Sequence, residues 1–135
     1  MNSKSKMMQD YIGVNVEALL NDEPFRNYKF ALSEVNDLPE YYCMYACEEY
    51  GFEFHCDEDK RITTIFVSRE SDLSDRLDVR IGCSSHDVRH RLGVPTKSGK
   101  SWDRFDGAKY SFHVSYDQYD LVEMITLMRD DVVPR

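Results

Sequence analysis

The sequence predicts a single α+β domain in which helices pack on one face of a mostly antiparallel β-sheet. A length of 135 residues suits one domain with its own hydrophobic core. Several short runs alternate apolar and polar residues, which is typical of half-buried strands. Two further segments have the apolar spacing or the capping residues of helices, and each precedes a group of these runs.

The first forty residues predict one helix and one strand. Apolar residues follow a helical spacing over about residues 9–21, and the turn-forming segment around Pro24 ends the pattern. A strand is expected over about residues 28–32, followed by a loop that contains Pro39.

The middle of the chain predicts three strands. Residues 41–47 and 50–56 alternate aromatic and small side chains, and a turn at 48–51 joins them. The β-branched run "RITTIFVS" at 61–68 is apolar on both faces, as expected for a central strand. In the strand before it, side chains should alternate between the faces: Phe52, Phe54 and Cys56 on one, and Glu53, His55 and Asp57 on the other.

The second half predicts a helix and three more strands. The helix in "CSSHDVRHRLGVP" has Ser84 or Ser85 as its N-cap and stops at Gly93 and Pro95. Strands are expected at 102–105, 109–115 and 121–128. The whole chain, 1–135, is then one domain, with residues 1–8 and 130–135 expected to be flexible.

The two halves resemble each other, which favours an internal duplication. "GFEFHCDEDKRITTIFV" matches "KYSFHVSYDQYDLVEMITL", because each has an aromatic residue, Phe-His, an acidic turn and then a β-branched strand. A helix closed by a proline-containing turn precedes each of them. Two helix-plus-hairpin repeats are the simplest account of this pattern.

The charge of the chain is concentrated in one segment. The chain has 25 acidic and 17 basic residues, for a net charge of -8, and residues 30–59 contain no Lys or Arg among many acids. Such a segment repels phosphate backbones, so the sequence predicts no direct binding of nucleic acid and favours a basic protein partner. The alternative reading, a solubilising face without a partner, stays open at this point.

The sequence gives no sign of a membrane span or of an export signal. No apolar run approaches the length of a membrane helix, and the N-terminal residues lack the apolar stretch of a signal peptide. We therefore expect a cytoplasmic protein whose four cysteines are reduced core residues.

Motifs of enzyme active sites are missing from the sequence. It has no glycine-rich phosphate loop, no nucleophile elbow and no metalloprotease motif. The spacing of Cys43, Cys47, His55 and Cys56 does not form zinc knuckles. We expect no enzyme, no cofactor and no metal. The alternative is a small hydrolase or metal-binding enzyme that uses His55 with a nearby cysteine or carboxylate.

The acidic segment also contains six aromatic residues between positions 41 and 54, which cannot all face one core if the strands alternate. Exposed tyrosine beside carboxylates suits the recognition of a cationic protein. Charge density alone selects the expected partner-binding residues: Glu48, Glu49, Tyr50, Glu53, Asp57, Glu58 and Asp59.

The order of these features resembles a known family. Over about residues 10–130, "GFEFHCDEDKRITTIFV", "VRHRLGVP" and "WDRFDGAKYSFHVSYDQYDLVEMITLM" together are similar to immunity proteins of bacterial polymorphic toxin systems, including contact-dependent growth inhibition. The doubled unit also looks like the tandem arrangement of the β-lactamase inhibitory protein. The resemblance implies a bacterial protein that binds and neutralises a cognate toxin domain, often a nuclease, without catalytic residues of its own.

Overall fold

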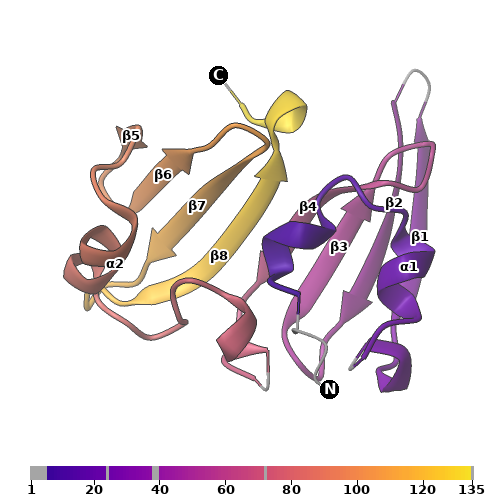
Figure 1. The fold of residues 1–135 in the computed structure, drawn as a ribbon, viewed down its shortest axis with the longest axis horizontal. Helices are drawn as coiled ribbons and strands as arrows, with labels where there is room; N and C mark the ends of the chain where they lie inside the picture. The colour runs from indigo at the N-terminus through magenta and orange to yellow at the C-terminus, as the bar shows by residue number, and fades with distance from the viewer. Residues whose placement is uncertain (1–5, 24, 38–39, 72, 135) are drawn as a thin grey trace.

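The computed structural model describes residues 6–23, 25–37, 40–71 and 73–134 as an eight-stranded antiparallel sheet with two α-helices (Figure 1). This architecture confirms the predicted fold class, α+β with mostly β structure. The strand order is β1-β2-β3-β4-β8-β7-β6-β5. Within the described residues, no helix is long and apolar enough to cross a membrane.

Each half of the chain contributes helices followed by four strands. The elements of the first half are the 3₁₀ helix η1 (Met8–Tyr11), α1 (Val16–Leu20), the 3₁₀ helix η2 (Phe25–Asn27), β1 (Ala31–Asp37), β2 (Glu40–Cys47), β3 (Phe52–Cys56) and β4 (Ile62–Val67). Those of the second half are η3 (Ser74–Arg76), α2 (Ser85–Leu92), β5 (Lys97–Ser98), β6 (Trp102–Asp106), β7 (Tyr110–Tyr116), β8 (Val122–Arg129) and the final 3₁₀ helix η4 (Asp130–Val132). We call the segments from η1 to β4 and from η3 to β8 the first and second repeats.

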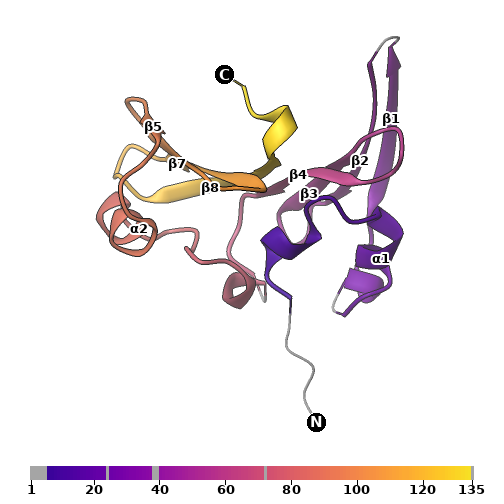
Figure 2. The same ribbon diagram turned by 45° about the horizontal axis from the view of Figure 1, so that its top comes forward.

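The two α-helices lie on the same side of the sheet, as predicted (Figure 2). We call this side the covered face and the opposite side the open face. The covered face carries the core, in which Phe25 makes edge contacts with Tyr11, Phe52 and Phe54. The C-terminal segment lies on the open face, where the Arg104 guanidinium donates a hydrogen bond of 3.0 Å to the Pro134 carbonyl (Figure 2).

The repeats meet at the centre of the sheet, where β4 pairs with β8 in antiparallel orientation. Phe66 lies opposite Thr126, and Thr64 lies opposite Met128. Because Phe66 and Thr126 occupy the same place in their repeats, an approximate twofold axis passes through this pair. The strand β4 is nearly fully buried, as expected for a central strand.

Matching turns show that the two halves are structural repeats. Asp57 accepts hydrogen bonds from the backbone N–H groups of residues 59 and 61, and Asp117 accepts them from residues 119 and 121. Lys60 and Asp120 follow with positive φ angles of 61° and 64°. These turns fix the alignment of the repeats, in which Asp57 corresponds to Asp117. Phe112-His113 then corresponds to Phe52-Glu53, two residues before Phe54-His55. The predicted match of the two Phe-His pairs was therefore wrong.

Three details of the first repeat differ from the sequence prediction. The single helix expected over 9–21 is split into η1 and α1 by a turn at Gly13, whose φ is 85°. The strand expected over 28–32 begins only at Ala31, because Tyr28 and Phe30 pack their rings against the core aromatic cluster. Each repeat is a helix followed by a four-stranded meander rather than by a single hairpin.

The second repeat follows the prediction more closely and adds one strand. Ser84 is the N-cap of α2, since its hydroxyl accepts from the backbone N–H of Asp87, and Gly93 is the C-cap. The short edge strand β5 was not predicted. At the two ends of the described chain, Met8 is fully buried and Val133 is 7% exposed, while residues 1–5 and 135 lie outside the described residues.

Candidate functional site

The expected partner-binding residues separate into two groups at opposite ends of β3. Residues 48–50 form the β2–β3 turn, whereas residues 57–59 form the β3–β4 turn. A five-residue strand separates the turns by about 17 Å at 3.3–3.4 Å per residue. The charge run in the sequence therefore does not make one continuous patch of seven residues.

The β2–β3 turn presents two exposed carboxylates. Glu48 and Glu49 are both exposed, and neither side chain makes an ion pair within the part of the chain that the structure describes. The Arg69 guanidinium donates to the backbone carbonyl of Glu49 at 2.6 Å rather than to its carboxylate. The turn is closed by Gly51, whose N–H donates to the Cys47 carbonyl.

Tyr50, in the same turn, belongs mainly to the packing of the covered face. It is half-buried, and its ring stacks on Tyr28 with a centroid distance of 4.1 Å and an interplanar angle of 22°. A partner could contact only its exposed part. The sequence could not reveal this contact, because Tyr28 lies in a separate segment.

Glu53 lies on the open face, in the position predicted by strand alternation. Its Oε2 lies 2.5 Å from His55 Nε2, and the His55 ring contacts Phe66 at 4.8 Å between centroids. Across the neighbouring strands Glu53 faces Ala46 on one side and Phe66 on the other. Its carboxylate therefore stands beside apolar surface and keeps about two fifths of its side chain exposed.

The first acid of the β3–β4 turn, Asp57, has a structural role. Besides its two backbone contacts, Asp57 accepts a hydrogen bond of 3.1 Å from the Arg129 guanidinium. Since Asp117 repeats the backbone contacts in the second repeat, this aspartate has the same structural role in both repeats. Glu58 and Asp59 are exposed at the tip, next to the exposed cations Lys60 and Arg61, so the net charge of this turn is small.

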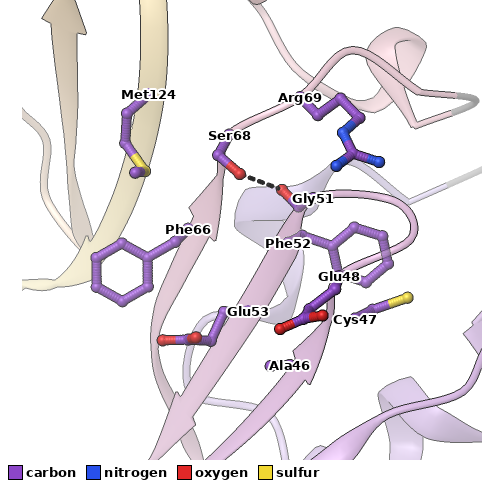
Figure 3. Close-up of a pocket in the computed structure, with 10 residues that line it drawn as sticks. All are labelled: Ala46, Cys47, Glu48, Gly51, Phe52, Glu53, Phe66, Ser68, Arg69 and Met124. Carbon is purple, nitrogen blue, oxygen red and sulfur yellow. Dashed lines mark hydrogen bonds between the residues drawn. The ribbon is translucent and has the colours of Figure 1, made fainter.

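A cavity of about 470 Å³ lies on the open face beside the β2–β3 turn (Figure 3). We call it the first hollow. The carboxylates of Glu48 and Glu53 border it, as Figure 3 shows, Arg69 also lines it, and its floor includes Phe66 and Met124. Met124 comes from β8, so both repeats contribute to the hollow. Apolar surface below two carboxylates suits a Lys or Arg side chain, whose aliphatic stem packs while its cation meets the acids.

Of the alternative enzymatic site, the structure brings together His55 and a carboxylate, that of Glu53, but not His55 and a cysteine. His55 meets a carboxylate, but Cys43, Cys47 and Cys56 face the covered side and are at most 1% exposed. Burial, followed by the neighbouring Cys43, raises the pKa of the Cys56 thiol to about 12. No Cys-His pair forms there, and within the described residues no group of three His, Cys, Asp or Glu residues could hold a metal ion.

Sequence reasoning misses the apolar part of the first hollow. The sequence places Phe66 only in a buried central strand, and Met124 in a distant strand. The one available signal is the lack of charged residues in β4, on a strand whose side chains alternate between the two faces of the sheet. The contact of Phe66 with Glu53 depends on strand pairing between β3 and β4.

Comparison with known proteins supports the fold and gives no family. No protein-family model matches the chain, and no curated protein sequence matches it significantly. Among solved structures, it is similar to an extracellular protein containing an SCP domain from Bacillus anthracis str. Ames, with a TM-score of 0.57 and 18% sequence identity. The match covers 97% of this chain and 48% of that one, so the chain spans about half the length of the matched structure. At this identity the likeness concerns the fold alone.

Proposed function

We propose that this chain is an immunity-type protein that binds a cognate toxin domain and neutralises it by stoichiometric association. The observation that carries the proposal is the first hollow, where Glu48 and Glu53 border an apolar floor on the sheet face opposite the two α-helices. Partly exposed apolar side chains with charges at their rim are typical of protein-binding surfaces.

The partner that fits this surface is a basic protein, and a nuclease domain is the best candidate. A nuclease carries Lys and Arg where it grips its phosphate backbone, and such side chains suit the hollow. The net charge of -8 adds long-range attraction and speeds association. The proposed place of action is the cytoplasm, and the chain itself does not bind nucleic acid or a membrane.

The test uses the protein encoded next to this chain, purified as a toxin domain. We expect a 1:1 complex with nanomolar or tighter affinity, which corresponds to a binding free energy of about -12 kcal/mol. The double variant Glu48→Gln/Glu53→Gln should slow association and weaken affinity about tenfold or more at low salt, because both rim charges are lost.

The matched control is Glu58→Gln/Asp59→Asn, which removes the same number of charges from the β3–β4 turn. We expect it to leave the affinity within about twofold, since long-range charge alone is screened at physiological salt. Equal effects of the two double variants would show that the hollow has no special role. If the neighbouring protein did not bind the unmodified chain at all, the immunity proposal itself would be wrong.

A further inference from the structure

The first hollow has a counterpart in the second repeat. A cavity of about 380 Å³, which we call the second hollow, lies on the open face over β6, β7 and β8. Its lining includes Trp102, Arg104 and His113. Its size is at the lower end of the 300–1,000 Å³ common for ligand pockets, and it is large enough for one bulky side chain of a partner protein.

One row of cross-strand neighbours connects the hollows. Following the pairing from β1 to β5, this row consists of Ala31, Ala46, Glu53, Phe66, Thr126, His113, Arg104 and Lys97. Side chains that face each other across antiparallel strands share a face, so the whole row lies on the open face. Strands lie about 4.8 Å apart, which puts Lys97 about 24 Å from Glu53.

The two ends of the row differ in charge. In the first repeat the carboxylate of Glu53 stands between Ala46 and Phe66, whereas in the second repeat His113 takes the equivalent place between Arg104 and Thr126. Arg104 is paired with Asp106 at 2.9 Å. Lys97 is exposed and makes no ion pair among the described residues, so it supplies the unpaired positive charge of this end.

The floor of the second hollow is aromatic and closely packed. The Trp102 indole stacks on the His113 ring, with centroids 5.2 Å apart and an angle of 25° between the planes. Gly99 packs so closely against the indole that a Cβ there would lie 2.0 Å from Trp102 Nε1. Burial and then the nearby Arg104 lower the pKa of His113, which keeps its imidazole neutral at pH 7.

We propose that the second hollow binds an apolar side chain that stands next to a carboxylate on the same partner protein, and thereby selects one of two pseudosymmetric orientations of that partner. This inference rests on the proposed function. Because of the approximate twofold axis at the Phe66–Thr126 pair, the backbone looks nearly the same after half a rotation about it. The backbone alone would therefore accept the partner in either of two orientations. In the reversed orientation its cations would meet Lys97 and its carboxylate would meet Glu48 and Glu53, and like charges disfavour that arrangement.

Trp102 is the single tryptophan of the chain, so its NMR and fluorescence signals report directly on the second hollow. The first experiment titrates the full chain with the capped dipeptides Ac-Phe-Asp-NH2 and Ac-Phe-Lys-NH2, and follows the indole N–H signal of Trp102 by NMR. We expect the acidic peptide to shift this signal saturably and to bind up to about fivefold more tightly than the basic one, as a single exposed charge contact allows.

Lys97→Glu should abolish or reverse this preference. Lys29→Glu is the matched control, because Lys29 is also exposed but lies outside the row. Lys97 is in a two-residue exposed strand, so its substitution should leave the fold intact. Shifts that do not depend on the charge of the peptide would mean a general apolar site for small molecules and would overturn the proposal, as would no shift with either peptide.

The second experiment uses the toxin domain and separates this inference from the proposed function. Binding should change the fluorescence of Trp102, and Trp102→Ala should weaken affinity about tenfold or more, as expected for a buried aromatic anchor. Tyr119→Ala, which removes an aromatic ring that is 73% exposed in the β7–β8 turn, should have no such effect. Tight binding without any contribution from Trp102 or Lys97 would overturn the inference and leave the proposed function standing.

Discussion

At the scale of single residues, Asp103 is the most heavily bonded side chain among the described residues. It is fully buried on the covered face, and it accepts two hydrogen bonds of 2.9 Å from Arg89 of α2. Ser98 and Tyr116 donate to the same carboxylate at 2.6 and 2.7 Å. The group therefore joins α2, β5 and β7 to β6.

This network makes stability depend on pH. Burial opposes the ionisation of Asp103, but the hydrogen bonds from Arg89, Ser98 and Tyr116 outweigh it and hold the pKa of the carboxyl below its ordinary value. The lowered pKa stabilises the fold above the unfolded-state pKa of about 3.9, and this contribution is lost as the pH falls through the lower folded-state value.

We expect Asp103→Asn to lower the free energy of unfolding by about 1–3 kcal/mol at pH 7, since a neutral amide cannot satisfy the same donors. Urea unfolding of both proteins between pH 7 and pH 2.5 measures the effect. The difference should begin to shrink near pH 4, the unfolded-state pKa, and should shrink further as the pH falls through the lower folded-state pKa, where the native carboxyl also becomes neutral. A constant difference over this range would show that the charge of Asp103 does not stabilise the fold.

The cysteines should react in an order set by burial. Cys43, Cys47 and Cys56 are at most 1% exposed, and the pKa of Cys56 is raised to about 12, whereas Cys83 is only half-buried. Alkylation requires a thiolate that the reagent can reach. With iodoacetamide at pH 8, mass spectrometry should find Cys83 modified first in the native protein, and all four cysteines modified in denaturant. Early labelling of Cys56 would contradict the native burial of this strand.

At the scale of elements, the two β-turns after β3 and β7 depend on their first aspartate. Asp57→Ala and Asp117→Ala should each cost about 1–2 kcal/mol, because each removes hydrogen bonds to two backbone N–H groups. Glu58→Ala, at the exposed tip, should change stability by less than about 0.5 kcal/mol. Thermal unfolding monitored by circular dichroism compares the three variants, and a cost for Glu58→Ala as large as that for Asp57→Ala would refute the structural role of Asp57.

The β2–β3 turn packs its glycine directly against the segment that follows β4. Gly51 has a φ of 69°, and a Cβ there would lie 2.5 Å from the Cβ of Arg69. Gly82 has a φ of 91°, and a Cβ there would meet no described atom within 4 Å, so Gly82→Ala measures backbone strain alone, about 1–2 kcal/mol. Gly51→Ala should cost more than this control in chemical unfolding, and equal costs would mean that Arg69 moves away freely.

Local signals account for the elements that sequence reasoning places correctly. The Ser84 cap and the Gly93 stop mark α2, and the β-branched run marks β4. The helix break at Gly13 escapes such reasoning because the apolar spacing continues past it. The contact of Glu53 with Phe66, and the long row across the open face, depend on the register of strands distant in sequence. A single sequence does not specify how its strands pair, so it could not reveal this contact or this row.

At the scale of the whole molecule, the central β4–β8 pair should make the two repeats unfold together. Ile65 and Leu127, which face each other across this pair, are both fully buried. Leu19→Ala in α1 should cost about 2–5 kcal/mol, as is usual for a buried leucine. If the repeats form one cooperative unit, the fluorescence of Trp102 in the second repeat should report the same lowered midpoint as far-ultraviolet circular dichroism.

Two separate transitions, with Trp102 unaffected by a substitution in α1, would instead mean that each repeat is stable by itself. The control is Val88→Ala in α2, a buried residue that lies in the same repeat as Trp102. It should shift both signals under either outcome, so only the response to Leu19→Ala distinguishes them.

The approximate twofold axis through Phe66 and Thr126 also has a genetic consequence. Two identical half-length chains could form the same sheet, but every substitution would then appear in both halves at once. A single gene that encodes both copies allows Glu53 to change without His113, and Ala46 to change without Arg104. One chain that carries both repeats thus permits an asymmetric surface on a nearly symmetric backbone.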